Sequence, residues 1–427
     1  LVKSQSAKLY CGYIYSDAGY GESTTDLVFA GDNMIAENGT ILARSKRFNN
    51  ECVYTELDLE RLVGERKKSN TYNIVGSEKY VSVKLDMNIG DTKITRYVDK
   101  QPFVPSDDKK REKRSEEILS IQSLGLKKRL DHTHAKTAVV GVSGGLDSTL
   151  ALLVTVRAFD SLNIDRKNII AVTMPCFGTT DRTYNNAVNF ANSLGVTLKE
   201  VNIKAAVNQH FADIEHDPNV YDVTYENSQA RERTQILMDV ANKSGGLVIG
   251  TGDMSELALG WATYNGDHMS MYGVNAGVPK TLIRYLVDYE AKRTNNDILK
   301  KTLQDILDTP VSPELLPPKD GKISQKTEHI VGPYELHDFF LYHLMRFGSK
   351  PSKILRLAEV AFDGIYDREV ILEWLKVFYR RFFAQQFKRS CLPDGPKVGS
   401  VALSPRGDWR MPSDASYQIW AKELETL

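Results

Sequence analysis

The chain has 427 residues, more than a single hydrophobic core usually supports, so two domains are expected. Its 55 Lys and Arg residues balance its 55 Asp and Glu residues, which gives no charge argument for a nucleic-acid or membrane partner. No apolar run is long enough to span a bilayer, and the four cysteines are too scattered for a disulfide framework or a zinc site, which together favour a cytoplasmic protein.

The first part of the chain, to about residue 105, is expected to consist mostly of β-strands. Alternating and β-branched runs predict strands at 9–15, 25–29, 40–48 and 52–57. The run Glu-Asn-Gly-Thr at 37–40 predicts a tight hairpin turn. Cys11 lies in the first of these strands, where we weigh a packed strand residue against a nucleophile. No neighbouring base or positive charge is visible to lower its pKa, and this favours the packed residue.

A linker is expected at 101–108, because this stretch carries two prolines and leads into a run of charges. The basic run at 109–114 can be interpreted as a nucleic-acid patch or as the solvated face of a helix. It opens a stretch with apolar residues at helical spacing, including Ile118, Leu119 and Leu126, and this favours the helix. We therefore expect one domain at 1–105, linker included, and a second at 106–427.

A phosphate-binding loop is predicted where an apolar strand at 137–142 runs into Ser143-Gly144-Gly145 and then into a helix carrying Ser148. The glycines let the backbone approach a ligand closely, and a helix N-terminus attracts anions. The order of residues differs from a Walker A loop. No lysine lies at the start of the helix, and Asp147 lies in the turn instead. A carboxylate that faces phosphates needs a metal ion between them. The alternative is an ordinary strand-to-helix turn, but this interpretation does not explain the presence of Ser143, Asp147 and Ser148 around the two glycines.

The stretch from residue 137 onward alternates strands and helices, which predicts a doubly wound, mostly parallel sheet with helices on both faces. Strands are expected at 137–142, 168–174, 196–203 and 247–251, with helices at 149–159, 183–194 and 228–242. Polar turns follow the first, second and fourth strands. Ligands of such sheets bind at the carboxyl ends of the strands, so these turns are expected to face one crevice. Beyond about residue 281, helices are expected at 332–347, 352–362 and 368–389, with their aromatic residues in a core rather than around a cofactor.

Further polar runs follow the loop in chain order. They are Asn227-Ser228-Gln229-Ala230-Arg231, then Gly250-Thr251-Gly252-Asp253-Met254-Ser255-Glu256, then Tyr264-Asn265-Gly266-Asp267, then Pro279-Lys280-Thr281. Each run alone is compatible with a cap, a turn or a surface charge. Together with Ser-Gly-Gly-Leu-Asp-Ser, they strongly resemble the synthetase domain of the NAD synthetases, a family of PP-loop ATP pyrophosphatases. The runs at 13–32 and 404–414 extend the resemblance to the glutamine-dependent type, whose front domain is a nitrilase-like glutaminase.

The resemblance implies a reaction, its substrates and its site residues. Deamido-NAD is adenylated by ATP, pyrophosphate leaves, and ammonia displaces AMP from the acyl-adenylate to give NAD. The implied metal is Mg²⁺, held by Asp147 and Glu256. The implied ATP site contains Ser143, Gly144, Gly145, Asp147, Ser148 and Thr251. Lys280 and Thr251 would neutralise charge on the phosphoryl oxygens, and Asp267 would orient or deprotonate ammonium. Asn227 and Arg231 are candidates for holding deamido-NAD, together with Asp267 and Lys280, and Arg182 for contacting adenosine or phosphate.

The same resemblance makes residues 1–105 the C-terminal part of the glutaminase domain. The Glu, Lys and Cys with which that domain hydrolyses glutamine would lie upstream of Leu1, so we expect a fragment that uses free ammonia where the full-length protein uses glutamine. Partners beyond the substrates are expected to be further copies of the chain, with no nucleic acid or membrane. Two alternatives remain: another PP-loop amidating ligase, similar to GMP synthetases, or a nucleotide-binding module that has lost catalysis. Asp147, Glu256, Asp267 and Lys280 are all present, and this argues against lost catalysis.

Overall fold

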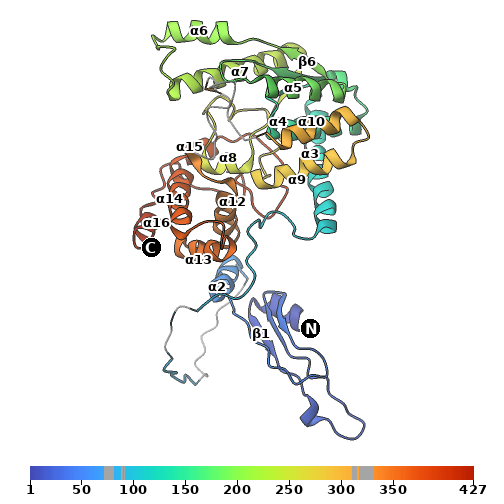
Figure 1. The fold of residues 1–427 in the computed structure, drawn as a ribbon, viewed down its shortest axis with the longest axis vertical. Coiled ribbons are helices and arrows are strands. Elements are labelled where there is room, and N and C mark those ends of the chain that lie inside the picture. Colours follow the sequence, from blue (N-terminus) through green and yellow to red (C-terminus); the bar gives the residue numbers. More distant parts are fainter. Residues whose placement is uncertain (72–80, 88–89, 91, 310–314, 317–329) are drawn as a thin grey trace. The chain divides into compact units, whose positions relative to one another are not determined.

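The computed structural model describes residues 1–71, 81–87, 90, 92–309, 315–316 and 330–427 (Figure 1). The chain forms two compact units, each described here by itself. The first contains residues 1–99 and 343–363, and the second contains residues 100–342 and 364–427. No helix of the described residues is long and apolar enough to cross a membrane.

The first unit is built on a three-stranded antiparallel sheet in the order β1-β2-β3. Its elements are α1 (Val2–Leu9), β1 (Gly12–Tyr15), η1 (Tyr20–Glu22), β2 (Met34–Glu37), β3 (Thr40–Arg44), α2 (Leu59–Lys68), η3 (His343–Phe347) and α13 (Pro351–Ala361). The predicted hairpin turn is confirmed, because Asn38 and Gly39 both take positive φ between β2 and β3. The predicted strands at 25–29 and 52–57 are wrong, and β2 and α1 were not predicted. Cys11 lies in the turn between α1 and β1 rather than in a strand.

The second unit is built on a five-stranded parallel sheet in the order β6-β5-β4-β7-β8. Its strands are β4 (Thr137–Gly141), β5 (Ile169–Thr173), β6 (Thr197–Glu200), β7 (Gly246–Gly250) and β8 (Tyr272–Gly273). The doubly wound α/β prediction is confirmed, and the four predicted strands are present within a few residues of their expected ends. The fifth strand, β8, has two residues and was not predicted.

Helices cover both faces of this sheet (Figure 1). They are α3 (Asp108–Thr133), α4 (Leu146–Leu162), α5 (Asp181–Leu194), α6 (Lys204–Asp213), α7 (Val223–Ser244), α8 (Met254–Leu259), α9 (Lys280–Arg293) and α10 (Asp297–Leu307), with the short η2 (Arg166–Asn168) before β5. Beyond the sheet lie α12 (Tyr334–Tyr342), α14 (Arg368–Ala384), α15 (Gln386–Arg389) and α16 (Gln418–Glu425). The helix predicted at 109 begins at Asp108, and the Asp107 side chain caps it by accepting from the Lys110 N–H.

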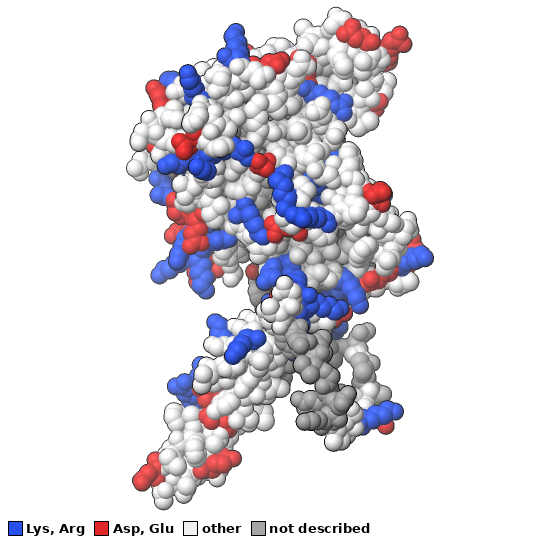
Figure 2. Space-filling model, turned by 180° about the vertical axis from the view of Figure 1, so that it is seen from behind, with Lys and Arg blue, Asp and Glu red and all other residues white. Residues whose placement is uncertain are grey.

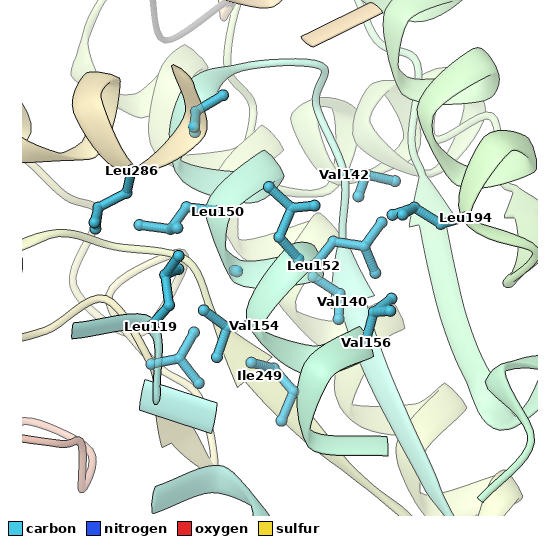
Figure 3. Close-up of a cluster of buried hydrophobic side chains, with 14 of the residues drawn as sticks. Leu119, Val140, Val142, Leu150, Leu152, Val154, Val156, Leu194, Ile249 and Leu286 are labelled. Carbon is cyan, nitrogen blue, oxygen red and sulfur yellow. The ribbon is translucent and has the colours of Figure 1, made fainter. Parts of the chain in front are cut away.

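The core is divided by the sheet into two layers, because successive residues of a strand point to opposite faces. Val140 and Ile249 lie in one layer with α4 residues such as Leu150, Leu152 and Val154 (Figure 3). The neighbouring residues Val139 and Val248 lie in the other layer, against α6 and α7. Helix α4 is buried over most of its length, so the loop at its N-terminus is held on a rigid support.

The surface carries both signs of charge, as the balanced composition predicts. Figure 2 shows basic and acidic side chains mixed over one face of the molecule. Many of the basic side chains are paired, as in the contacts of Arg157 with Glu116 and Glu290, which join α4 to α3 and α9. These ion pairs help to hold α3, α4 and α9 together beside the sheet.

Candidate active site

The predicted phosphate loop follows β4 and turns tightly into α4. Gly144 has φ of +82°, and a Cβ there would lie 2.2 Å from the carbonyl oxygen of Thr183, so only glycine fits. Ser143 Oγ accepts from the Gly145 N–H at 3.3 Å, and Ser148 Oγ lies 3.3 Å from Ser143 Oγ. The two hydroxyls therefore lie side by side at the start of a buried helix, as a phosphate-binding loop requires.

A cavity of about 290 Å³ opens beside this loop and is lined by residues from all the predicted polar turns. The site candidates along its wall are Ser143, Gly145, Asp147, Ser148, Thr251, Glu256 and Asp267. The expected crevice at the carboxyl ends of β4, β5 and β7 is thus present. Thr179, from the turn after β5, also lines it.

Four charged side chains meet beside the cavity. Lys280 Nζ lies 2.7 Å from Asp147 Oδ2, 2.7 Å from Asp253 Oδ2 and 2.9 Å from Glu256 Oε1. Helix α8 supplies Glu256 and is capped by Asp253, α4 supplies Asp147, and Lys280 opens α9. Lys280 and Asp253 are buried, whereas Asp147 and Glu256 are about one-fifth exposed on the cavity side. We call these four residues the charge cluster.

Burial and mutual repulsion set the ionisation of the cluster. Burial raises the pKa of Asp253 well above its ordinary value, and repulsion by Glu256 and Asp147 raises it further against the attraction of Lys280. Burial and the nearby Asp147 likewise raise the pKa of Glu256 to about 7. Burial lowers the pKa of the Lys280 ammonium, but its three carboxylate neighbours outweigh this and raise it. Three carboxylates share a single lysine, so the cluster favours an additional cation.

The cluster also fits the geometry of a divalent metal site. Asp147, Asp253 and Glu256 each offer an oxygen, and these oxygens lie within 4.8 Å of one another. Asp147 Oδ1 is buried and has no hydrogen-bond partner among the described residues. Carboxylate oxygens are the ligands that Mg²⁺ prefers, so these residues fit the expected ion. Asp253 was not predicted as a ligand, because an aspartate three residues before a glutamate is typical of a helix N-cap. Asp253 does cap α8.

Asp267 lies on the cavity wall apart from the charge cluster. Its Oδ1 accepts from the Thr263 N–H at 2.8 Å, and burial raises its pKa. Lys388 holds the loop that leads to it by donating to the carbonyl oxygens of Gly260 and Ala262 at 2.8 and 2.6 Å. The site therefore has a carboxylate with a raised pKa on the cavity wall.

The remaining candidates lie behind the cavity wall or away from it. Asn227 accepts from Thr263 Oγ1 at 2.7 Å, so it supports the loop of Asp267 from α7. Arg231 donates to the carbonyl oxygen of Tyr264 at 3.3 Å, and neither it nor Asn227 is among the described residues lining the cavity. Arg182 forms a two-pronged exposed ion pair with Asp305 of α10. Arg233, two residues beyond Arg231 on α7, lines the cavity and was not predicted.

Comparisons with known proteins agree with this arrangement. A family model described as NAD synthase matches residues 118–366. Over 459 aligned residues, the chain is 42% identical to the glutamine-dependent NAD(+) synthetase of Mycobacterium leprae, covering 100% of this chain and 68% of that protein. The corresponding synthetase of Mycobacterium tuberculosis gives the same identity and coverage. This chain therefore spans about two thirds of the length of these relatives.

The fold agrees with a solved structure as well. The glutamine-dependent NAD(+) synthetase of Cytophaga hutchinsonii superposes with a TM-score of 0.61 at 19% identity, covering 100% of this chain and 66% of that one. At this identity the superposition shows a shared fold.

Proposed function

The chain belongs to the NAD synthase family, and from this premise we propose that it catalyses the ATP-dependent amidation of deamido-NAD to NAD. The observation that carries the proposal is the joining of the Ser-Gly-Gly loop, the charge cluster and Asp267 around one cavity. This arrangement suits a reaction in which two polyanions meet and an amine then attacks.

In the first step, the nicotinate carboxylate attacks the α-phosphate of ATP, and pyrophosphate leaves. The backbone N–H groups of the loop and the hydroxyls of Ser143 and Ser148 hold the phosphates in line. Lys280 and Thr251 stabilise the charge that grows on the phosphoryl oxygens. Asp147 and Glu256, with Asp253 beside them, would hold Mg²⁺, which supplies positive charge to screen the triphosphate when it is bound.

In the second step, ammonia attacks the acyl carbon of the adenylate and AMP leaves. The nitrogen must lose a proton as the amide forms, and we assign Asp267 to receive or orient it. Its raised pKa supports this role, because a carboxylate of higher pKa is a stronger base. We assign Asn227 and Arg231 to holding the loop on which deamido-NAD binds.

We further propose that residues 1–105 are the C-terminal part of a nitrilase-like glutaminase domain and residues 106–427 the synthetase domain. The identity of 42% with proteins named glutamine-dependent NAD(+) synthetases, across the whole of this chain, supports glutamine as the nitrogen source of the full-length protein. Free ammonia is the proposed source for the synthetase reaction by itself. Assembly with further copies of the chain and a cytoplasmic location stay predictions.

The test is the exchange of labelled pyrophosphate into ATP. We expect exchange that depends on deamido-NAD, and NAD, AMP and pyrophosphate in equal amounts once ammonium is added. Exchange that depends on a purine nucleotide instead of deamido-NAD would identify a ligase similar to GMP synthetases. Protein that exchanges with neither would be a nucleotide-binding module.

A further inference from the structure

A buried carboxylate on α12 lies behind the charge cluster. Asp338 is 2% exposed, and both of its oxygens are used. One oxygen accepts a hydrogen bond from the Ser255 hydroxyl. The other accepts from the N–H and the hydroxyl of Thr281, at 3.0 and 2.6 Å. Asp338 therefore touches α8 and α9 at their N-terminal ends.

These two ends carry three members of the charge cluster. Ser255 lies between Asp253 and Glu256 on α8, and its Oγ accepts from the Lys280 N–H at 2.8 Å. Thr281 is the residue after Lys280 on α9. The Asp338 side chain thus fixes the backbone of Lys280 relative to Asp253 and Glu256, two of the three carboxylates that the Lys280 ammonium contacts.

A second residue of α12 contacts the other end of the lysine. The ring of Tyr334 has its centroid 5.3 Å from Lys280 Nζ. Tyr334 and Asp338 are four residues apart, so they lie on the same face of the helix. Helix α12 supports Lys280 at its backbone through Asp338 and at its ammonium through Tyr334.

The arrangement matters because the charge cluster is self-repelling. Three carboxylates near one lysine push apart, and side chains that repel one another keep their places only when their backbones are held. A buried carboxylate at the N-terminus of α9 is itself stabilised by the two donors of Thr281 and by the helix dipole.

We propose that Asp338 is a positioning residue for the adenylation step, acting through Ser255 on Lys280 and on the carboxylates of α8. This inference rests on the proposed function, since the step it serves is the transfer from ATP. Asp338 is not among the described residues that line the cavity, so we assign it a role through its neighbours and not a direct contact with substrate.

The test compares Asp338→Asn with the unaltered protein in two measurements. In pyrophosphate exchange, we expect the maximal rate to fall on the order of 10-fold to 100-fold with little change in the KM for ATP, because misplacement of a catalytic group lowers the rate of reaction more than binding. In hydrogen–deuterium exchange, we expect the amides at 280–283 to exchange faster, because the acceptor of the Thr281 N–H is weakened. The second measurement needs no substrate.

Two further variants sharpen the comparison. Ser255→Ala breaks the link between Asp338 and Lys280 with a small change in volume. Like Asp338→Asn, it should lower the rate of pyrophosphate exchange and speed the exchange of the amides at 280–283. This variant keeps the test open if Asp338→Asn fails to fold. Phe340→Leu is the control, because Phe340 lies on the same helix and packs against Phe378 in the aromatic core. Phe340→Leu should lower the melting temperature and leave the rate of pyrophosphate exchange per folded molecule unchanged.

The proposal also predicts coupling with Lys280. In a Lys280→Met background, adding Asp338→Asn should cost much less than it does alone, because the group that it positions is gone. Equal losses in both backgrounds, or unchanged amide exchange at 280–283, would overturn the positioning role. Failure of the unaltered protein to exchange pyrophosphate would instead overturn the proposed function and leave the amide measurement to decide the positioning.

Discussion

Lys280 is the residue on which the charges of the site converge. It opens α9, lies within 2.9 Å of each of its three carboxylate partners, and is almost fully buried. Such a site is poor for stability, because burying several like charges costs more than one counter-charge returns. The arrangement is understandable as a binding site for phosphates and a cation, where stability is given up for function.

Removing one carboxylate should therefore separate activity from stability. We expect Asp147→Asn to lower pyrophosphate exchange on the order of 100-fold or more while the melting temperature stays the same or rises, because repulsion in the cluster is relieved. Asp160→Asn is the matched control on the same helix, since Asp160 forms an exposed pair with Arg166. Near-normal exchange by Asp147→Asn at ordinary magnesium concentrations would remove Asp147 from the metal site.

Removing the lysine should have the opposite effect on stability. Lys280→Ala leaves three adjacent carboxylates, of which Asp253 is buried, without their counter-charge, so we expect a clear fall in melting temperature. The maximal rate of adenylation should fall on the order of 100-fold, with the KM for deamido-NAD little changed, since the charge is needed where phosphoryl charge develops. Lys292→Ala, which removes an exposed lysine of the same helix, should change neither. A raised KM with an intact kcat would make Lys280 a binding residue.

At the scale of elements, one buried amide joins the two loops that carry the site. Asn275 donates to the carbonyl oxygens of Asp147 and Thr251 at 2.9 and 3.0 Å, and its own oxygen accepts from Gln122 of α3 at 3.1 Å. The phosphate loop and the turn after β7 are thereby tied to one another and to the helix layer.

Asn275→Ala should loosen both loops together. It removes the Asn275 donor from the carbonyl oxygens of Asp147 and Thr251, so we expect a loss of about 2–4 kcal/mol in the free energy of unfolding and a raised KM for ATP. Asn186→Ala is the control, because Asn186 donates to Asp305 on the edge of the same unit. Urea unfolding and initial rates would measure both effects, and a loss of stability with an unchanged KM would show that the link is structural alone.

The sequence predicted the second unit better than the first for a physical reason. The inner strands β4, β5 and β7 of the parallel sheet are largely buried, so each appears as a short apolar run between turn residues. Strands β1 and β3 of the first unit are partly exposed, and a run such as 52–57 has β-forming residues without a neighbouring strand to pair with. The two residues of β8 were too few to give any pattern.

The same distinction holds for the site. Ser143, Gly145, Asp147, Thr251, Glu256 and Asp267 lie in compact motifs at strand ends, and the structure brings them to one cavity. Asp253, Asp338 and Asn275 act through contacts between elements, and no spacing in the sequence marks such contacts. Arg233, which lines the cavity, was not predicted, because helical phase near a loop cannot be fixed from a motif alone.

For the molecule as a whole, buried histidines should set the acid limit of stability. Burial lowers the pKa of His337 to about 4, against about 6.5 in an unfolded chain, so the folded state favours the neutral ring. Its contribution is fully present above about pH 6.5 and is lost as the pH falls towards 4, which amounts to about 3 kcal/mol. The first unit holds a second such ring, since burial also lowers the pKa of His343 to about 4.

The prediction is checked by urea unfolding at pH 7.5 and at pH 5. His337→Gln should reduce the difference in unfolding free energy between the two conditions, and His132→Gln, on the exposed end of α3, should leave it unchanged. An unaltered difference in His337→Gln would assign the acid sensitivity to other groups.

The contacts of the last stretch of the second unit bear on how the protein is made. Leu392 and Pro393 line the cavity, the Gly273 N–H of β8 donates to the Asp394 carbonyl oxygen at 2.7 Å, and Arg389 donates to the carbonyl oxygens at the end of α8. A ribosome that has translated as far as Lys280 has already made every residue of the charge cluster, yet none of these late contacts exists. The self-repelling cluster then lacks these late contacts until more than a hundred further residues have been made, so we expect the nascent chain to be open to misfolding during that interval.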